Sequence, residues 1–270
     1  MSNGLTTEQR RAKLLELIRS HGFVSIPDLR AQLDVSESTI RRDLDHLEET
    51  GEAQRTHGGV FFTGPTANLR LFEHKRAEQW EKKRQIAMEA ARLIEDHDTV
   101  LLDGGSTTYE LARQLVGRPL QVVTNSLPLA HLFAASEQAD VVMLGGYVHS
   151  RTGVSLGPYA NQMLSSLNVQ KAVLSIAGAN ERGFYNSNLL LVETERAMMQ
   201  AADMTIVVAD SGKFGRSSLA RLCGLEDVAA VVSDDELDRN WVARLESAGV
   251  KLHLAPTSRP EVVKEGEQAS

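Results

Sequence analysis

The 270-residue chain has a single cysteine, Cys223, and no hydrophobic run that approaches the roughly 20 residues of a membrane-spanning helix. One cysteine cannot form an intrachain disulfide, and apolar residues surround Cys223 in the sequence, so we expect a buried structural thiol and neither a metal nor a cofactor. The N-terminus also lacks the basic and apolar segments of a secretion signal. These absences predict a cytoplasmic protein that does not contact a membrane.

An excess of positive charge is also absent, because the net charge is −7 and residues 1–60 carry eight Lys/Arg against ten Asp/Glu. This balance excludes a protein that coats nucleic acid through bulk charge. Any DNA contact must therefore come from local placement of basic side chains. The most basic stretch, residues 70–84, has six Lys/Arg against three Glu, and predicts either a solvated linker face or phosphate contacts.

The length predicts two domains, since a domain commonly takes about 100 to 200 residues. We expect a small N-terminal module over residues 7–62, a basic connecting segment over 63–82 and a larger domain over 83–255. Residues 256–270 contain too little apolar surface to offset the entropy lost on ordering, so they predict a disordered tail.

The N-terminal module shows the pattern of a helix-turn-helix. Residues 7–21 carry apolar residues at helical spacing, residues 23–24 form an extended piece, and Ser25 can cap a second helix that ends at Leu33. A tight turn follows, and Ser36 caps a third helix whose inward stripe is Ile40, Leu44 and Leu47. Two short helices joined by so brief a turn are typical of this motif.

The third helix carries the candidate DNA contacts. With Ile40 inward, a turn of about 100° per residue points Ser38 and Arg42 outward and places Thr39 and Arg41 on the flanks. We expect Ser38, Thr39 and Arg42 to contact bases and Arg41 to contact phosphate, with Ser36 at the helix start. The alternative is a solvated amphipathic helix in which Asp43 or Asp45 holds one arginine in an ion pair.

Residues 52–60 read as a strand, a glycine turn and a returning strand, which together form a wing. Arg55 and His57 are candidates for contacts to phosphates or the minor groove, although a lone histidine in a turn is commonly just exposed. Residues 35–44 (VSESTIRRDL), Leu47-Glu48 and His57-Gly58-Gly59 resemble the N-terminal signature of the DeoR family of bacterial transcription regulators. Val60 departs from the alanine usual in that family.

The C-terminal region alternates strands and helices, which indicates a doubly wound, mainly parallel α/β domain. We expect strands at residues 99–102, 120–123, 141–144, 172–176, 205–209 and 229–232. Helices are expected at residues 83–95, 109–116, 127–135, 192–202 and 239–248. Ligands bind such sheets beyond the carboxyl ends of the strands.

Glycine, hydroxyl and charged residues recur at those strand ends. The candidate ligand contacts are Asp103, Gly104, Gly105, Ser106, Thr107, Thr108, Thr124, Asn125, Gly145, Gly146, Asp210 and Lys213. Backbone N–H groups and hydroxyls at a helix start form an anion site that suits a phosphate group. The alternative is that these glycines and hydroxyl residues only form the turns after each strand. The glycine spacing fits neither a dinucleotide fingerprint nor a Walker loop.

The resemblance to the DeoR family extends to this region, whose domain in that family is similar to ribose-5-phosphate isomerase. It implies a phosphorylated sugar or related metabolite as effector, with Glu193 as an acidic contact. The resulting prediction is a non-enzymatic transcription regulator that represses a carbohydrate-metabolism operon. It is expected to bind operator DNA as a homo-oligomer, either a dimer or a tetramer.

Two alternatives remain at this point. One is a sugar-phosphate isomerase with an appended DNA-binding domain, in which Asp103, Asp210 and Lys213 transfer protons. The other is a sugar-binding module whose N-terminal helices dock a protein instead of DNA. No set of catalytic residues is assigned.

Overall fold

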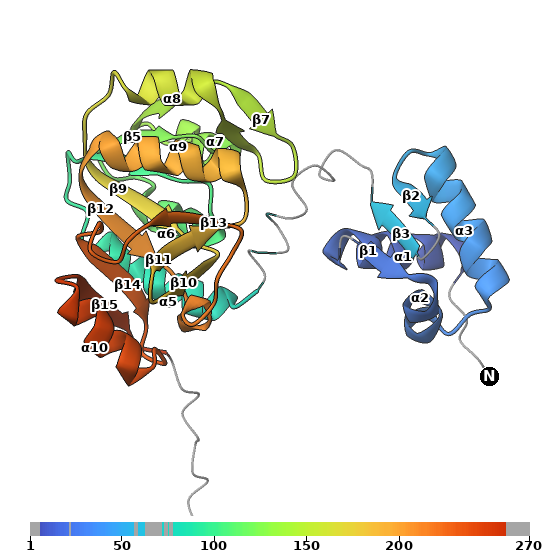
Figure 1. The fold of residues 1–270 in the computed structure, drawn as a ribbon. Coiled ribbons are helices and arrows are strands. Elements are labelled where there is room, and N and C mark those ends of the chain that lie inside the picture. Colours follow the sequence, from blue (N-terminus) through green and yellow to red (C-terminus); the bar gives the residue numbers. More distant parts are fainter. Residues whose placement is uncertain are drawn as a thin grey trace, which may run out of the picture.

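The computed structural model describes residues 6–21, 23–56, 59–62, 72, 75 and 78–257, which form an N-terminal module and a C-terminal domain (Figure 1). The predicted disordered tail lies almost wholly outside these residues, as do most of the connecting segment and two of its basic residues, Arg70 and Arg76.

The N-terminal module has the predicted elements. Its described parts are α1 (Thr7–His21), β1 (Phe23–Ser25), α2 (Ile26–Leu33), α3 (Glu37–Glu49), β2 (Ala53–Thr56) and β3 (Gly59–Phe62). The strands form an antiparallel sheet in the order β1-β3-β2, and β2 pairs with β3 as the expected wing.

One small apolar core holds this module together. Ile40, Leu44 and Leu47 of α3 are buried, as the stripe predicted, and they belong to the same cluster as Leu14 of α1 and Leu29 of α2. Because three helices share this core, the position of α3 depends on the packing of α1 and α2.

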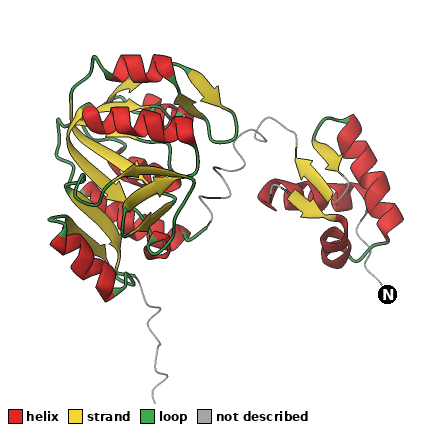
Figure 2. Cartoon of the chain, in the orientation of Figure 1, coloured by secondary structure: helices red, strands yellow, loops and turns green. Residues whose placement is uncertain are grey.

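The C-terminal domain is built on a seven-stranded parallel sheet (Figure 2). Its strands are β4 (Thr99–Leu102), β5 (Gln121–Thr124), β6 (Asp140–Met143), β9 (Val169–Ser175), β12 (Ala202–Val208), β14 (Ala230–Asp234) and β15 (Lys251–Ala255). The order is β15-β14-β12-β9-β4-β5-β6. The predicted fold class, a winged helix-turn-helix followed by a parallel α/β domain, is confirmed.

Helices cover both faces of the sheet. Apolar residues of α5 (Trp80–Ala91), α6 (Ser106–Leu115) and α7 (Leu127–Ala134) belong to one core. Those of α8 (Pro158–Leu164), α9 (Leu189–Gln200) and α10 (Arg239–Ser247) belong to the other. Along β4, Val100 and Leu102 face the first core and Leu101 faces the second, which is the alternation of a doubly covered strand.

Several short elements were not predicted. They are the hairpin β7 (Tyr147–His149) and β8 (Val154–Leu156), the antiparallel sheet of β10 (Gly178–Asn180), β11 (Gly183–Asn186) and β13 (Ala220–Cys223), and the helices α8 and η2 (Ser211–Lys213). Strands of three or four residues are too short to show a period. Predicted helix starts were also late: α6 begins at Ser106, not residue 109, and α9 at Leu189, not residue 192.

Two expectations that rested on absences concern the membrane and the cysteine. Among the described residues, no helix is long and apolar enough to cross a bilayer. Cys223 lies half-buried on β13, where burial and then the nearby Asp227 carboxylate raise the pKa of the thiol to about 12. The thiol therefore stays protonated at neutral pH and acts as a packing group.

The order in which the chain adds strands to the parallel sheet reverses at the centre of the sheet, between β4 and β9. From β4 the chain proceeds outward through β5 and β6, whereas from β9 it proceeds the other way through β12, β14 and β15. The crevice between the carboxyl ends of β4 and β9 is therefore the topological switch point, where open α/β sheets bind ligands.

Candidate functional site

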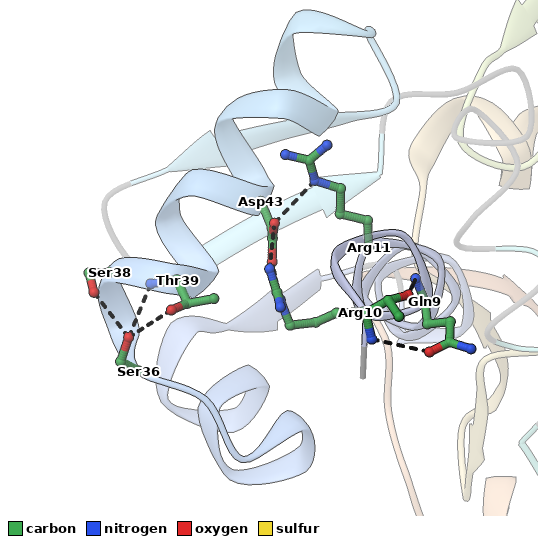
Figure 3. Close-up of polar contacts among 8 residues, drawn as sticks. Gln9, Arg10, Arg11, Ser36, Ser38, Thr39 and Asp43 are labelled. Carbon is green, nitrogen blue, oxygen red and sulfur yellow. Dashed lines mark hydrogen bonds and ion pairs between the residues drawn. The ribbon is translucent and has the colours of Figure 1, made fainter. Parts of the chain in front are cut away.

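Three hydroxyl groups meet at the start of α3 (Figure 3). Ser36 Oγ accepts a hydrogen bond from the backbone N–H of Thr39 at 3.3 Å, so Ser36 is the predicted helix cap. The same oxygen lies 3.0 Å from Ser38 Oγ and 2.8 Å from Thr39 Oγ1. The three predicted contacts thus form one exposed polar cluster at a helix N-terminus, where phosphate oxygens bind well.

The two arginines of α3 differ in what they contact. Arg41 donates from Nε and Nη2 to Glu37 Oε1, at 3.0 and 2.7 Å, one helical turn away. Arg42 is exposed and has no ion-pair partner among the described residues. Arg42 is therefore available to read a base, whereas Arg41 must leave a surface carboxylate to contact DNA.

The wing is tied to α3 through Arg55. Its Nη1 lies 2.8 Å from Asp45 Oδ1, and its Nε lies 3.4 Å from Glu48 Oε2. In the alternative to DNA contact, Asp45 pairs with an arginine of α3, but Asp45 pairs with the wing instead. The predicted contact His57 lies outside the described residues.

Asp43 is a positioning residue that sequence reasoning missed. It is buried, and its carboxylate binds Arg10 Nε at 2.5 Å, Arg10 Nη2 at 3.2 Å and Arg11 Nε at 3.1 Å (Figure 3). The alternative of a local ion pair on α3 therefore holds for Arg41, but its partner is Glu37 and not Asp43. The available signal was its place three residues after inward-facing Ile40, which puts it beside the buried stripe.

A cavity of about 460 Å³ opens at the switch point of the C-terminal domain. Its wall includes the end of β4, the first turn of α6, the end of β9, the β7–β8 turn and part of α9. Six predicted residues line it, namely Asp103, Gly104, Gly105, Ser106, Thr107 and Lys213. Phe72, Lys75 and Glu78, from the segment that leads to the N-terminal module, line it as well.

Asp103 joins the two central strands. Its Oδ2 accepts from the backbone N and the Oγ of Ser175, at 2.8 and 2.9 Å, and its Oδ1 accepts from Gly105 N at 3.0 Å and from the Thr108 hydroxyl. Burial raises the pKa of Asp103, and these four hydrogen bonds oppose that rise. With four donors already bound, Asp103 shapes the cavity and has little capacity left for a ligand.

The two glycines after Asp103 permit close approach of neighbouring strands. A Cβ on Gly105 would lie 1.7 Å from Ser175 Oγ, and a Cβ on Gly104 would lie 2.0 Å from Val154 Cγ1. A side chain at Gly105 would displace β9, because its Cβ would also lie 2.5 Å from Ser175 Cβ, and one at Gly104 would displace the Val154 side chain. The glycines therefore bring the first turn of α6, with its free N–H groups, against the cavity.

Lys75, Lys83 and Lys213 lie close enough together in the cavity wall to affect one another's charge. Buried Lys83 donates from Nζ to the backbone carbonyl of Glu78 at 2.6 Å and to that of Lys75. Burial is the main cause that lowers the pKa of Lys83 to about 8, although the Asp210 carboxylate opposes it; Lys213 and Lys75 lower it further. Burial and Lys213 likewise lower the pKa of Lys75. A bound anion would relieve this repulsion.

Both the N-terminal module and the C-terminal domain match models of known protein families. A family model described as the DeoR-like helix-turn-helix domain matches residues 10–66, and one described as the DeoR C terminal sensor domain matches residues 78–235. The chain belongs to the DeoR family of transcription regulators. Its C-terminal domain is accordingly the sensor domain.

Relatives in this family include regulators of known name. The chain is 35% identical to the transcriptional repressor AccR of Agrobacterium fabrum, over 85% of this chain and 90% of that one. It is 31% identical to the transcriptional regulator IolR of Bacillus subtilis, over 91% and 98%, and 30% identical to the L-fucose operon activator of Escherichia coli, over 84% and 94%. A solved structure with partial similarity is ribose 5-phosphate isomerase A from Neisseria gonorrhoeae, with TM-score 0.37, 16% identity and coverage of 49% and 52%.

The remaining predicted contacts in the sensor domain lie away from the cavity wall. Thr108 is buried beneath it, bound to Asp103, and Thr124 Oγ1 donates to the Leu102 carbonyl at 2.8 Å. Asn125 exchanges hydrogen bonds with Ser155, donating from Nδ2 at 3.1 Å and accepting from Ser155 N at 2.7 Å, which fixes β8. Gly145 and Gly146 lead from β6 into the β7–β8 hairpin. Thr108, Thr124 and Asn125 therefore hold together the elements around the cavity, whereas a Cβ on Gly145 would contact nothing there in the described part of the chain.

The two remaining acidic candidates, Glu193 and Asp210, do not line the switch-point cavity. Glu193 is exposed, and Glu195, two residues along α9, lines the cavity instead. Two residues correspond to about 200° around a helix, so only one of the two can face inward. Asp210 lines a neighbouring cavity of about 700 Å³, next to Lys82 and Trp241, and its Oδ2 lies 4.0 Å from Lys213 Nζ.

In the described part of the basic stretch 70–84, Arg84 is exposed, as a solvated face predicts, whereas Lys82 and Lys83 are held by the sensor domain. Lys82 Nζ lies 3.2 Å from Asp234 Oδ1 and 2.8 Å from Glu236 Oε2, and Lys83 is buried in the cavity wall. The segment therefore belongs to the sensor domain from at least Glu78 onward, because its lysines are bound there.

Proposed function

We propose that this regulator represses a carbohydrate-metabolism operon in the cytoplasm, and that a phosphorylated sugar in the switch-point cavity changes its affinity for operator DNA. The observation that carries the proposal is the cluster of Lys75, Lys83 and Lys213 in the wall of the cavity that the first turn of α6 also lines. Ammonium groups and helix N–H donors together suit a dianionic phosphate. The cavity volume, about 460 Å³, accommodates a small sugar beside that group.

Names of the relatives support the regulatory direction and the broad class of target. AccR is named a repressor, and another relative is named an activator of an L-fucose operon. We choose repression because the relative with the greater identity is the repressor. We also propose a dimer or tetramer, since helix-turn-helix proteins read paired half-sites on a two-fold symmetric operator.

The cavity wall offers a route from ligand to DNA. Phe72, Lys75 and Glu78 line the cavity and precede α5, while the N-terminal module ends some ten residues earlier, at Phe62. A ligand that contacts this segment binds differently according to where the segment lies, and such differential affinity is what allostery requires.

Fluorescence anisotropy with DNA that flanks the gene for this protein tests the proposal. Full-length protein should bind a specific fragment at low salt, where phosphate contacts are strongest, and one member of a panel of sugar phosphates should weaken that binding. Lys213→Ala should bind DNA normally but lose the response, whereas Lys251→Ala, an exposed lysine on β15, should keep it. Absence of DNA binding, or of any effect of the panel, would contradict the proposal.

We propose binding without turnover. The four hydrogen bonds on Asp103 leave no free base at the end of β4, and the ion pair of Asp210 and Lys213 is long, at 4.0 Å. Incubation of the same panel with the protein, followed by NMR of the sugars, checks this. Isomerised product that Lys213→Ala abolishes would favour the enzyme instead.

A further inference from the structure

Glu195 is a fully buried acid in the wall of the switch-point cavity. Its Oε1 accepts a hydrogen bond from Asn186 Nδ2 at 2.7 Å, and the same amide donates to the Ser175 carbonyl at 3.1 Å. Its Oε2 is buried and has no hydrogen-bond partner among the described residues. A buried polar atom without a partner costs free energy, so a ligand atom that bonds to this oxygen would relieve that cost.

The charges around Glu195 decide which form of the acid is present. Two of the donors on Asp103 are backbone N–H groups, which cannot act as acceptors and therefore favour its carboxylate form. Burial, and then the Asp103 charge, raise the pKa of Glu195 well above its ordinary value, while the Asn186 amide opposes this rise. Of the two neighbouring acids, Glu195 therefore holds the proton.

No cation neutralises Glu195 within ion-pair distance among the described residues. The packed elements bring Asp103 from β4, Arg221 and Cys223 from β13 and Arg196 from α9, and the cavity rim brings Lys75, Glu78, Lys83, His149, Arg151 and Lys213. Arg196 donates to the carbonyls of Leu222 and Arg221, at 2.8 and 2.6 Å, and so is occupied elsewhere.

We propose that Glu195 is a specificity-determining residue that meets the effector as a neutral acid, donating a hydrogen bond from its Oε2 hydroxyl to an uncharged oxygen of the ligand. This inference rests on the proposed function, because it concerns the same cavity. A charged carboxylate offers only acceptors, whereas the neutral acid offers a donor to a sugar hydroxyl or carbonyl. The lysines then bind the phosphate, and Glu195 reads the sugar.

The state of Glu195 can be measured without a ligand. In the unfolded chain Glu195 ionises near its ordinary pKa of 4.5, whereas in the folded chain it keeps its proton to higher pH. The folded state therefore binds more protons above that value, and the wild type loses stability as pH rises. The melting temperature of Glu195→Gln should equal that of the wild type near pH 4.5 and exceed it near pH 8. Glu193→Gln, at the exposed neighbour, should show no such pH-dependent difference from the wild type in melting temperature.

The contact itself is tested by calorimetry with sugar phosphates and inorganic phosphate on full-length protein. Glu195→Gln retains a donor and should bind the sugar phosphate within about twofold of wild type, whereas Glu195→Ala should bind it about tenfold more weakly. Inorganic phosphate should bind all three equally. Equal loss in both variants would show a charged acceptor, and no loss in Glu195→Ala would show that there is no contact; either result overturns the inference.

The two proposals fail in different ways. If the wild type binds no sugar phosphate, the proposed effector class is wrong and the ligand contact falls with it. A melting temperature of Glu195→Gln that stays below that of the wild type at every pH overturns the neutral acid alone, whatever the ligand.

Discussion

In the N-terminal module the buried Asp43 is bound by two guanidinium groups, whereas in the sensor domain the buried Asp103 and Glu195 have no cation at ion-pair distance among the described residues. The first arrangement fills every oxygen with charged donors and locks α1 to α3. The second relies on neutral donors and leaves Glu195 Oε2 open. The contrast is local to the cavity, because buried Asp234 and Asp98 of the same sensor domain are paired with Lys82 and Lys171. The buried charge beneath the DNA-binding surface is saturated, whereas the wall of the proposed ligand cavity keeps hydrogen-bonding capacity in reserve.

The largest expected effect is the loss of stability when Asp43, the buried acid bound by two arginines, is removed. Asp43→Ala leaves Arg10 and Arg11 facing each other without a counter-charge, and should destabilise the N-terminal module by about 3 kcal/mol, near the low end for a buried pair because both arginines are partly solvated. Hydrogen exchange of α1 and α3 amides in the full chain measures this. Asp45→Ala, at an exposed pair, should cost less than about 1 kcal/mol; an equal cost for the two would refute the contrast.

A glycine substitution breaks the other side. Gly105→Ala places a methyl group 1.7 Å from Ser175 Oγ, so β9 and α6 must separate and the Asp103 hydrogen bonds must distort. We expect a loss of about 2 kcal/mol in stability, typical of overpacking, and loss of the response to sugar phosphate. Gly145→Ala, which meets nothing within 4 Å, should retain both. Thermal unfolding and the anisotropy response measure these two effects. If Gly105→Ala behaved like Gly145→Ala in both, the close packing at Gly105 would not be needed for stability or for the response.

Arginine substitutions on α3 sharpen the comparison at the surface. Arg42→Ala should weaken operator binding by about 1 to 3 kcal/mol and relax specificity at one base pair, because Arg42 is free to read a base. Arg41→Ala should weaken all sequences alike and reduce the salt slope by about 1. Arg239→Ala in the sensor domain serves as the control. Anisotropy titrations on operator and scrambled DNA at several salt concentrations separate these outcomes.

The smallest effect is a pH dependence opposite in sign to that of Glu195. Lys83 has a pKa near 8 when folded and an ordinary value of 10.5, so between these values the unfolded chain binds more protons and folding becomes more favourable as pH rises. The wild type should therefore gain melting temperature relative to Lys83→Met between pH 8 and pH 10. Lys251→Met should track the wild type, and a wild-type loss over this range would mean that Lys83 is not depressed.

Local chemistry was predictable from the sequence and distant pairing was not. The Ser36 cap, the buried face of α3 and the parallel strands depend on residues close in the chain. Asp43, by contrast, finds its partners 33 and 32 residues away on α1, which no local pattern reveals. The choice between Glu193 and Glu195 depended on which side of α9 faces the cavity. The place of Lys75 and Lys83 in the cavity wall depended on how the connecting segment packs against the sheet.

The carboxylates beside Arg41 and Arg55 have a consequence for the cell. Each phosphate that these arginines contact must displace Glu37, or Asp45 and Glu48, so arbitrary DNA gains less from them than from unpaired arginines. Chromosomal DNA offers an excess of competing sites of about a million-fold or more, and weak affinity for those sites keeps the protein free to reach its operator. A regulator built in this way can hold its operator occupied with few copies per cell.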